Sequence, residues 1–309
     1  MYYQTQAVRL VTFRIGTARE ARASAPGALI ESGRKVAALP GFSSVLEIVE
    51  GGQNALDRAY EIIRHSPTVL AVENITLLAP IPHPPQMRDF LCFEQHLKQA
   101  FDAVGKLSGT PSQIPKVWYE RPIFYHPSRF SVCGPDAEVS WPAYCEKLDF
   151  ELEFGCYIGK PGKDIPKKQA REHIFGYTIF NDFSARDEQA KEMAGQLGPG
   201  KGKDFDNANA MGPCLVTADE LGDPYRLEMV VRVNGEEWGR GNSRDMHWKF
   251  EDCIAHASRS ETLHSGEFFG SGTVGNGCGL EHLRFLKPND VVELEVEGIG
   301  ILRNRVVRG

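Results

Sequence analysis

Carboxylate side chains occupy every second position of residues 148–154, which read LDFELEF. Because successive side chains of a β-strand point to opposite faces, this segment predicts a strand with one apolar face and one face carrying Asp149, Glu151 and Glu153. That acidic face is either solvated or a cation site, since neighbouring like charges repel unless a cation lies between them. Oxygen ligands without imidazole or thiolate suit hard divalent cations such as Mg²⁺, Mn²⁺ or Ca²⁺.

A second group of polar residues lies in residues 181–189, NDFSARDEQ. Asp182 offers a further carboxylate after an expected strand. Arg186 and Gln189 are three residues apart on an expected helix and therefore face the same way. The alternative interpretation is a capped surface helix with a salt-bridging arginine.

Glycines surround the lysines of residues 198–206, GPGKGKDFD. A lysine on such a mobile loop could stabilise negative charge that develops on a bound anion, although a plain flexible loop is the commoner meaning. The sequence GSGTVG at residues 270–275 matches a dinucleotide-binding pattern, but no helix is expected after it, so this fingerprint lacks its required context.

The composition narrows the class of protein. The chain has 309 residues, 35 Lys plus Arg and 41 Asp plus Glu, and a formal charge of −6, which argues against a nucleic-acid partner. No apolar run reaches the roughly 20 residues of a membrane span. Arginines interrupt the apolar N-terminal stretch, which argues against a secretory signal, so a cytoplasmic protein is expected. Seven scattered cysteines without a CxxC pair indicate reduced thiols.

Two parts are expected along the chain. Residues 1–80 read as a small N-terminal α/β module, and residues 81–309 read as a β-rich domain. The segment APIPHPP at residues 79–85 reads as the linker, because proline continues neither a helix nor a central strand. In the first part we expect strands at 7–15 and 35–39 and helices at 44–50 and 54–65.

The second part contains two hairpin patterns and one strand-to-helix pattern. Asn234 and Gly235 form the strongest short-range hairpin signal in the chain. The hairpins are expected to join 225–233 to 236–240 and 291–296 to 301–307. The strand-to-helix pattern predicts a strand at 175–180, a turn at Asn181 and Asp182, and a helix at 185–193 that Ser184 caps.

Six collinear segments resemble the fumarylacetoacetate hydrolase family, over nearly all of residues 86–309. LDFELEFGCYIGKPGKDI resembles the acidic-strand motif of that family, GYTIFNDFSARDEQ its second metal motif and KDFDNANAMGP its lysine loop. NSRDMHW, SGEFFGSGTVGNG and GIGILRNRVV resemble its C-terminal segments. The resemblance implies an α+β, β-rich fold, with a mixed β-sandwich roll as the C-terminal domain.

The resemblance also implies metal ligands, catalytic groups and substrate-binding groups. The implied ligands of a divalent metal, with Mg²⁺ as the first choice, are Glu151, Glu153, Asp182 and Asp89. The implied catalytic groups are the general base His96, its orienting carboxylate Glu281 and the oxyanion-stabilising Lys203. The implied substrate-binding residues are Arg186, Gln189, Tyr125 and Thr273.

Three positions depart from the family pattern. Leu91 and Met193 stand where fumarylacetoacetase has substrate-facing tyrosines, so fumarylacetoacetate itself is in doubt as the substrate. Gln99 stands where smaller members have the glutamate that pairs with the histidine, so the pair here has to be His96 with Glu281. The resemblance also implies that residues 97–115 act as a lid.

Together these features predict a metal-dependent hydrolase that cleaves a carbon–carbon bond in a 1,3-dicarbonyl acid, such as an acylpyruvate or a relative of fumarylacetoacetate. His96 would activate water, and the metal and Lys203 would stabilise the departing enolate. Two alternatives stay open: a tautomerase, isomerase or decarboxylase of 2-oxo acids on the same site, and a non-catalytic metal-binding module. The expected partner is a small oxo acid, and the resemblance implies a homodimer.

Overall fold

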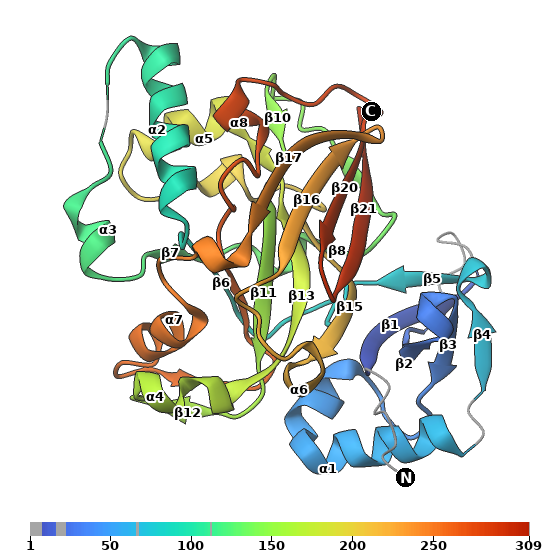
Figure 1. Ribbon diagram of the computed structural model, residues 1–309. Helices are drawn as coiled ribbons and strands as arrows, with labels where there is room; N and C mark the ends of the chain where they lie inside the picture. The colour runs from blue at the N-terminus through green and yellow to red at the C-terminus, as the bar shows by residue number, and fades with distance from the viewer. Residues whose placement is uncertain (1–7, 17–22, 66–67, 112, 309) are drawn as a thin grey trace.

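Two β-sheets form the body of the protein (Figure 1). The structure is a computed structural model, and it describes residues 8–16, 23–65, 68–111 and 113–308. The larger sheet has the strand order β4-β3-β2-β1-β15-β13-β11-β19-β6-β7, and β5 and β8 pair with β1 and β15. The smaller sheet has the order β17-β16-β20-β21-β9 and packs against β13 and β15. The two sheets share a continuous apolar core, so the fold is the strand-rich mixed fold that the sequence predicts.

The N-terminal elements are a small group of strands and one long helix. The strands expected at 7–15 and 35–39 are present as β1 and β3, although Ala7 lies outside the described residues. The two helices expected at 44–50 and 54–65 form one helix, α1, whose backbone is irregular at Gly52, where φ is 58°. The elements are β1 (Arg9–Ile15), β2 (Ala25–Ile30), β3 (Lys35–Ala38), α1 (Val45–Arg64), β4 (Val69–Ala71) and β5 (Ile75–Leu78).

Strand β1 joins these N-terminal strands to the rest of the larger sheet. It pairs antiparallel with β15 (Asn209–Thr217), so that Arg9 lies opposite Val216. Residues 79–85 contain no helix or strand, as expected of a linker rich in proline. The domain boundary at residue 80 stays a prediction, because the sheet continues across it.

The central strands differ from the sequence predictions in three places. The strand expected at 148–154 is divided into β10 (Leu148–Asp149) and β11 (Leu152–Ile158), and β10 pairs with β14 (Ser184–Ala185). The turn expected at Asn181 and Asp182 is wrong, because both residues end the strand β13 (Ile174–Asp182), where β15 pairs with them. The expected Ser184 cap is also wrong, because Ser184 lies in β14 and helix α5 (Arg186–Met193) has no side-chain cap.

Both predicted hairpins of the smaller sheet are confirmed. Asn234 and Gly235 adopt positive φ values of 53° and 81° in the tight turn between β16 and β17. The strands of this sheet are β9 (Glu138–Ser140), β16 (Glu228–Val233), β17 (Glu236–Asn242), β20 (Val291–Val296) and β21 (Gly300–Val307).

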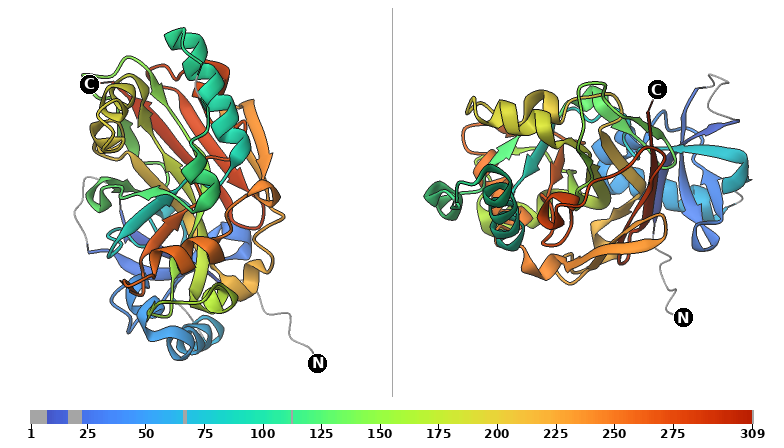
Figure 2. Two further views of the ribbon diagram at one scale, coloured as in Figure 1. Left: turned by 90° about the vertical axis from the view of Figure 1, so that its left-hand side faces the viewer. Right: turned by 90° about the horizontal axis from the view of Figure 1, so that it is seen from above.

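The remaining elements surround the two sheets. Helix α2 lies beside the strands at the end of the molecule away from α1 (Figure 2), and it packs against α8. None of the helices in the described ranges combines the length and the hydropathy that a membrane crossing requires. The remaining strands are β6 (Met87–Phe90), β7 (Phe124–Tyr125), β8 (Val132–Cys133), β12 (Gly162–Lys163), β18 (Thr262–Leu263) and β19 (Phe268–Gly270). The remaining helices are α2 (Glu94–Ser108), α3 (Lys116–Glu120), α4 (Lys167–Ala170), α6 (Ala218–Leu221), α7 (Phe250–Ala257) and α8 (Gly279–His282).

Candidate metal and catalytic site

Four buried carboxyl groups converge on one point of the larger sheet. Asp89 comes from β6, Glu153 from β11 and Asp182 from the end of β13. Glu151 lies directly before β11, in an isolated bridge with Cys278. One oxygen of each group lies within 4.8 Å of the corresponding oxygens of the other three. Gly270 makes this approach possible, because a Cβ at that position would lie 2.3 Å from Asp89 Oδ1. The solvated interpretation of the acidic face is therefore wrong, because both faces of the segment are buried.

The charge of this cluster fits a divalent cation. Burial and the neighbouring carboxylates raise the pKa values of Asp89 and Glu153 well above their ordinary range, and burial raises that of Asp182 to about 6. Glu153 Oε2 and Asp182 Oδ1 are buried, and no described residue forms a hydrogen bond with them. A hard cation between these oxygens would supply the missing partner and reverse the repulsion, and oxygen-only ligands suit Mg²⁺, Mn²⁺ or Ca²⁺.

Lys203 is the nearest cation to the cluster. Its Nζ donates to Glu151 Oε2 and to Asp182 Oδ2, both at 2.6 Å, and its side chain is buried. Burial raises the pKa of Glu151, but Lys203 and Arg186 outweigh that effect and lower this pKa to about 2. The glycine-rich loop is not a free linker, because Gly202 lies so close to α5 that a Cβ there would be 2.5 Å from Gln189 Cα.

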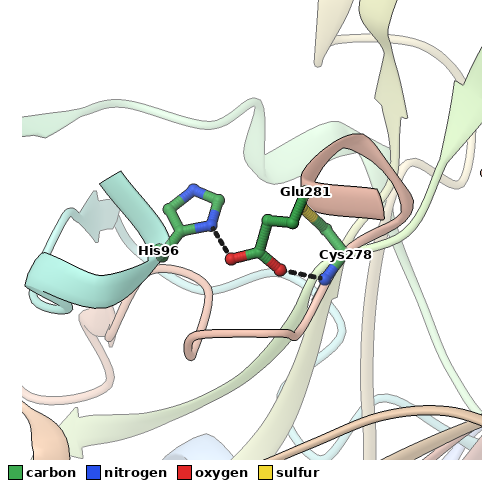
Figure 3. Close-up of side chains that lie close together, drawn as sticks. All are labelled: His96, Cys278 and Glu281. Atoms are coloured by element: carbon green, nitrogen blue, oxygen red, sulfur yellow. Dashed lines mark hydrogen bonds and ion pairs between the residues drawn. The ribbon is translucent and has the colours of Figure 1, made fainter. Parts of the chain in front are cut away.

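His96 and Glu281 form a hydrogen-bonded pair beside the cluster (Figure 3). His96 Nδ1 lies 2.9 Å from Glu281 Oε1, and Glu281 Oε2 accepts a hydrogen bond from the Cys278 N–H at 3.0 Å. Because a carboxylate only accepts, Nδ1 carries the proton in this pair and Nε2 is left as the basic nitrogen. Cys278, whose N–H is bonded to Glu281, also forms an isolated β-bridge with Glu151, which places the pair close to the acids.

Gln99 has a different partner from His96. Its Nε2 donates to Asn276 Oδ1 at 2.6 Å, and its Oε1 accepts from the Asn276 N–H at 3.1 Å. The departure noted at this position therefore has a structural role, in which α2 holds the loop before α8. The lid expected at 97–115 stays a prediction; its residues 97–108 belong to α2, and residue 112 lies outside the described residues.

Arg186 connects the acids to α5. Its Nη1 lies 2.8 Å from Glu151 Oε1 and donates to Gln189 Oε1 at 3.0 Å, while its Nε donates to Asp149 Oδ2 at 2.8 Å. Its Nη2 is buried, and the described residues offer it no hydrogen-bond partner. One donor of this guanidinium is therefore available to a bound anion.

The other two expected substrate-binding residues contact the acids directly. Tyr125 donates from its hydroxyl to Asp182 Oδ2 at 2.5 Å, and burial raises the pKa of this phenol well above its ordinary value. Thr273 is buried and donates to Glu153 Oε1 at 3.5 Å. Both side chains therefore lie within the cluster.

One residue of the site was missed in the sequence, and a second was recognised there only as part of the acidic face. Asn181 accepts the Glu151 N–H at 3.0 Å with its Oδ1, and so holds the backbone at the start of β11. Asp149 is fully buried against Arg186 and was not assigned a role. Its place in the period-two row of acids was the available signal.

Comparison with known proteins shows the family of this chain. Residues 86–307 match the family described as "Fumarylacetoacetate (FAA) hydrolase C-terminal". The chain belongs to this family. It is 35% identical to a mitochondrial oxaloacetate tautomerase from Xenopus laevis. The match extends over 262 residues, which are 84% of this chain and 77% of that protein. It is 32% identical to the oxaloacetate tautomerase YisK of Bacillus subtilis, over 76% of this chain and 74% of that protein.

A solved structure extends the likeness to the whole fold. A probable 2-hydroxyhepta-2,4-diene-1,7-dioate isomerase from Mycobacterium abscessus superposes with a TM-score of 0.76 at 27% identity, over 98% of this chain and 99% of that one. The chain is thus an enzyme of the fumarylacetoacetate hydrolase family, whose enzymes bind a divalent metal.

Proposed function

We propose that this family member is a divalent-metal-dependent tautomerase that interconverts the keto and enol forms of a small 2-oxo dicarboxylic acid of the oxaloacetate type. The hydrogen bond between His96 and Glu281, next to four converging carboxyl groups, is the observation that carries the proposal. The pair provides one oriented base, and tautomerisation needs one proton moved from carbon and one moved to oxygen. The tautomerase names of the relatives support this substrate class.

The metal would be held by Asp89, Glu151, Glu153 and Asp182, and we propose Mg²⁺ as its identity. Its chemistry, when bound, is that of a Lewis acid that polarises the 2-oxo group and fixes the adjacent carboxylate.

The protein's own groups then move the proton. His96 Nε2 takes the proton from C3 of the oxo acid. The electron pair of the broken C–H bond then forms the C2=C3 double bond, and the π pair of the carbonyl becomes a lone pair on the enolate oxygen. Glu281 stabilises the imidazolium that forms. Return of a proton to the oxygen completes the enol, and the reverse sequence forms the ketone.

Two cations are placed to bind the negative charge of the substrate. Lys203 Nζ lies between Glu151 and Asp182, where it can stabilise the developing enolate. The free Nη2 of Arg186 suits the carboxylate of the substrate. These assignments retain the roles that the sequence predicted.

Hydrolysis of a carbon–carbon bond in an acylpyruvate is the second candidate. The same base would deprotonate a water rather than C3, and the enolate would leave instead of being reprotonated in place. The family description names a hydrolase, which keeps this reaction as the alternative.

A single assay separates the two reactions. Enolic oxaloacetate is mixed with enzyme and Mg²⁺, and the loss of enol absorbance is followed while NMR records the carbon skeleton. The proposal predicts faster ketonisation with no new carbon fragments, abolished by EDTA and restored by Mg²⁺. No acceleration with oxaloacetate, together with release of pyruvate from an acylpyruvate, would replace the proposal with the hydrolase.

A further inference from the structure

Asp149 is a buried acid that lies outside the four-carboxylate cluster. Its Oδ1 accepts hydrogen bonds from the N–H groups of Phe150 and Gly279, at 2.9 and 2.7 Å. Its Oδ2 accepts from the N–H of Leu280 at 2.9 Å and from Nε of Arg186 at 2.8 Å. Both oxygens are therefore fully used, and all four partners are donors.

The groups that Asp149 holds belong to different parts of the site. Gly279 and Leu280 open helix α8, whose third residue is Glu281, the carboxylate that orients His96. Arg186 continues past Asp149 to the carboxylate of Glu151, at 2.8 Å. One carboxylate thus joins the base pair to the guanidinium beside the metal cluster.

We infer that Asp149 is a positioning residue that couples the His96–Glu281 base to the Arg186 guanidinium. It contacts neither substrate nor metal in this assignment and acts through the two groups it holds. The inference rests on the proposed function for its kinetic consequences only, since the positioning itself is a property of the folded protein.

The backbone around α8 is shaped for this contact. A Cβ on Gly279 would lie 2.6 Å from Asp149 Oδ1 and 1.9 Å from the carbonyl oxygen of Arg284. Only a residue without a side chain allows the carboxylate to reach the helix start so closely.

The path of the chain near Asp149 is already fixed by backbone bonds. Gly277 accepts the Leu152 N–H at 2.9 Å, and Gly279 accepts the Arg284 N–H at 2.9 Å. What Asp149 adds is the orientation of the first turn of α8 and the plane of the guanidinium. That plane leaves Nη2 of Arg186 buried and free of described partners, as a substrate carboxylate requires.

The test is Asp149→Asn. Asparagine keeps the shape of the side chain, but an NH₂ group, which donates hydrogen bonds, replaces one of the two accepting oxygens. Whichever way it turns, its NH₂ faces two of the four donors, so the helix start or Arg186 has to move. The expected result is a fall of about 10–100-fold in kcat and a rise in KM, as for loss of a group that orients ligands.

Asp252→Asn is the matched control. Asp252 is also a carboxylate at a helix start: it accepts the Lys249 N–H at 3.2 Å and pairs with Lys167, but it contacts none of the site residues named above. Its variant is expected to lower the melting temperature with kcat and KM unchanged. Asp149→Ser, which leaves room for a water, replaces Asp149→Asn if the asparagine variant does not fold.

A second readout needs no turnover. ¹⁵N NMR of the imidazole reports which nitrogen of His96 carries the proton: the wild type is expected to show Nδ1–H alone, and the Asp149 variant a mixture of tautomers. The inference would be overturned if the folded Asp149 variant showed the same His96 tautomer, the same kcat and the same KM as the wild type. If the wild type turns over no oxo acid, the proposed function fails, while the NMR result still decides whether Asp149 positions the base.

Discussion

The ammonium of Lys203 lies 2.6 Å from Oε2 of Glu151 inside the buried acidic cluster. The same ammonium lies 2.6 Å from Asp182, so one protein cation faces several carboxyl groups. Arg186 adds a second positive charge beside Glu151, but two cations do not balance four carboxyl groups. Burial and mutual repulsion therefore raise the pKa values of Asp89 and Glu153. This imbalance is the physical reason to expect a divalent cation.

The first prediction concerns pH and the metal. The pKa of Asp182 is raised in the folded state, from 3.8 to about 6, and those of Asp89 and Glu153 are raised in the same direction. A carboxyl with a raised folded-state pKa stabilises the metal-free fold while it is protonated, and this contribution is lost as the pH rises from 3.8 through about 6. A metal binds the ionised form, so the rise in melting temperature caused by Mg²⁺ is expected to grow over the same interval.

The measurement is thermal unfolding in EDTA and in excess Mg²⁺ at several pH values. Asp182→Asn, which removes the titrating group, is expected to flatten the pH dependence of the Mg²⁺ effect. An Mg²⁺-induced shift that is equal on both sides of this interval would contradict the prediction.

The second prediction concerns Lys203→Met, which keeps the length of the side chain and removes its charge. Loss of an oxyanion donor is expected to lower kcat by about 10²–10³-fold. Because the buried carboxylates lose their partner, the metal-free variant is expected to be less stable by about 3–5 kcal/mol. Mg²⁺ should restore much of the stability and little of the activity. Activity that recovers together with stability would remove Lys203 from the chemistry.

The third prediction concerns the base pair. Glu281→Gln keeps the shape of the side chain but loses the charge that stabilises an imidazolium, and His96→Asn removes the base. Both are expected to lower kcat by about 10²–10⁴-fold in steady-state kinetics. Glu94→Gln is the control on the same helix, because Glu94 is bonded to Lys98 and Tyr119 and not to His96. Equal losses in the control and the pair variants would refute the assignment.

Gln99→Glu is expected not to rescue Glu281→Gln. Gln99 is directed to Asn276, through two hydrogen bonds, so a carboxylate there would lose the bond to Asn276 Oδ1 without reaching His96. The double variant should therefore be no more active than Glu281→Gln alone. Recovered activity would mean that position 99 can approach the histidine.

The fourth prediction concerns Gly270→Ala. A Cβ at this position would lie 2.3 Å from Asp89 Oδ1, so the carboxylate has to move out of the cluster. Isothermal titration with Mn²⁺ is expected to show weaker binding than in the wild type. Gly105→Ala, where the nearest atom would be 3.5 Å away, should bind Mn²⁺ as the wild type does. Unchanged affinity in Gly270→Ala would exclude Asp89 as a ligand.

Asp149, Glu151 and Glu153 could be found in the sequence because the period of two is a local signal, whereas Asp89 was placed only by the family resemblance. The fate of their strand face could not, since it depends on which distant segments cover it. Glu151, for instance, lies in a bridge to Cys278, more than a hundred residues away. The same limit explains the error at Asn181 and Asp182, which resemble a turn locally but end a strand because β15 pairs with them.

Pairings between side chains of distant segments were the least predictable part. The partner of Gln99 is Asn276, and the partners of Asp149 are Arg186 and the start of α8. Each contact depends on how α2, α5 and α8 pack, and no local pattern records that packing. The order of strands in the larger sheet was equally hard to predict, because β1 pairs with β15, which is some 200 residues away in the sequence.

The most direct test of the metal site is a crystal structure of the enzyme with Mn²⁺, measured at a wavelength where manganese scatters anomalously. The account predicts one anomalous peak enclosed by oxygens of Asp89, Glu151, Glu153 and Asp182, at about 2.0–2.3 Å. A map with no peak among these four carboxylates, from protein that is active only with Mn²⁺ present, would contradict it.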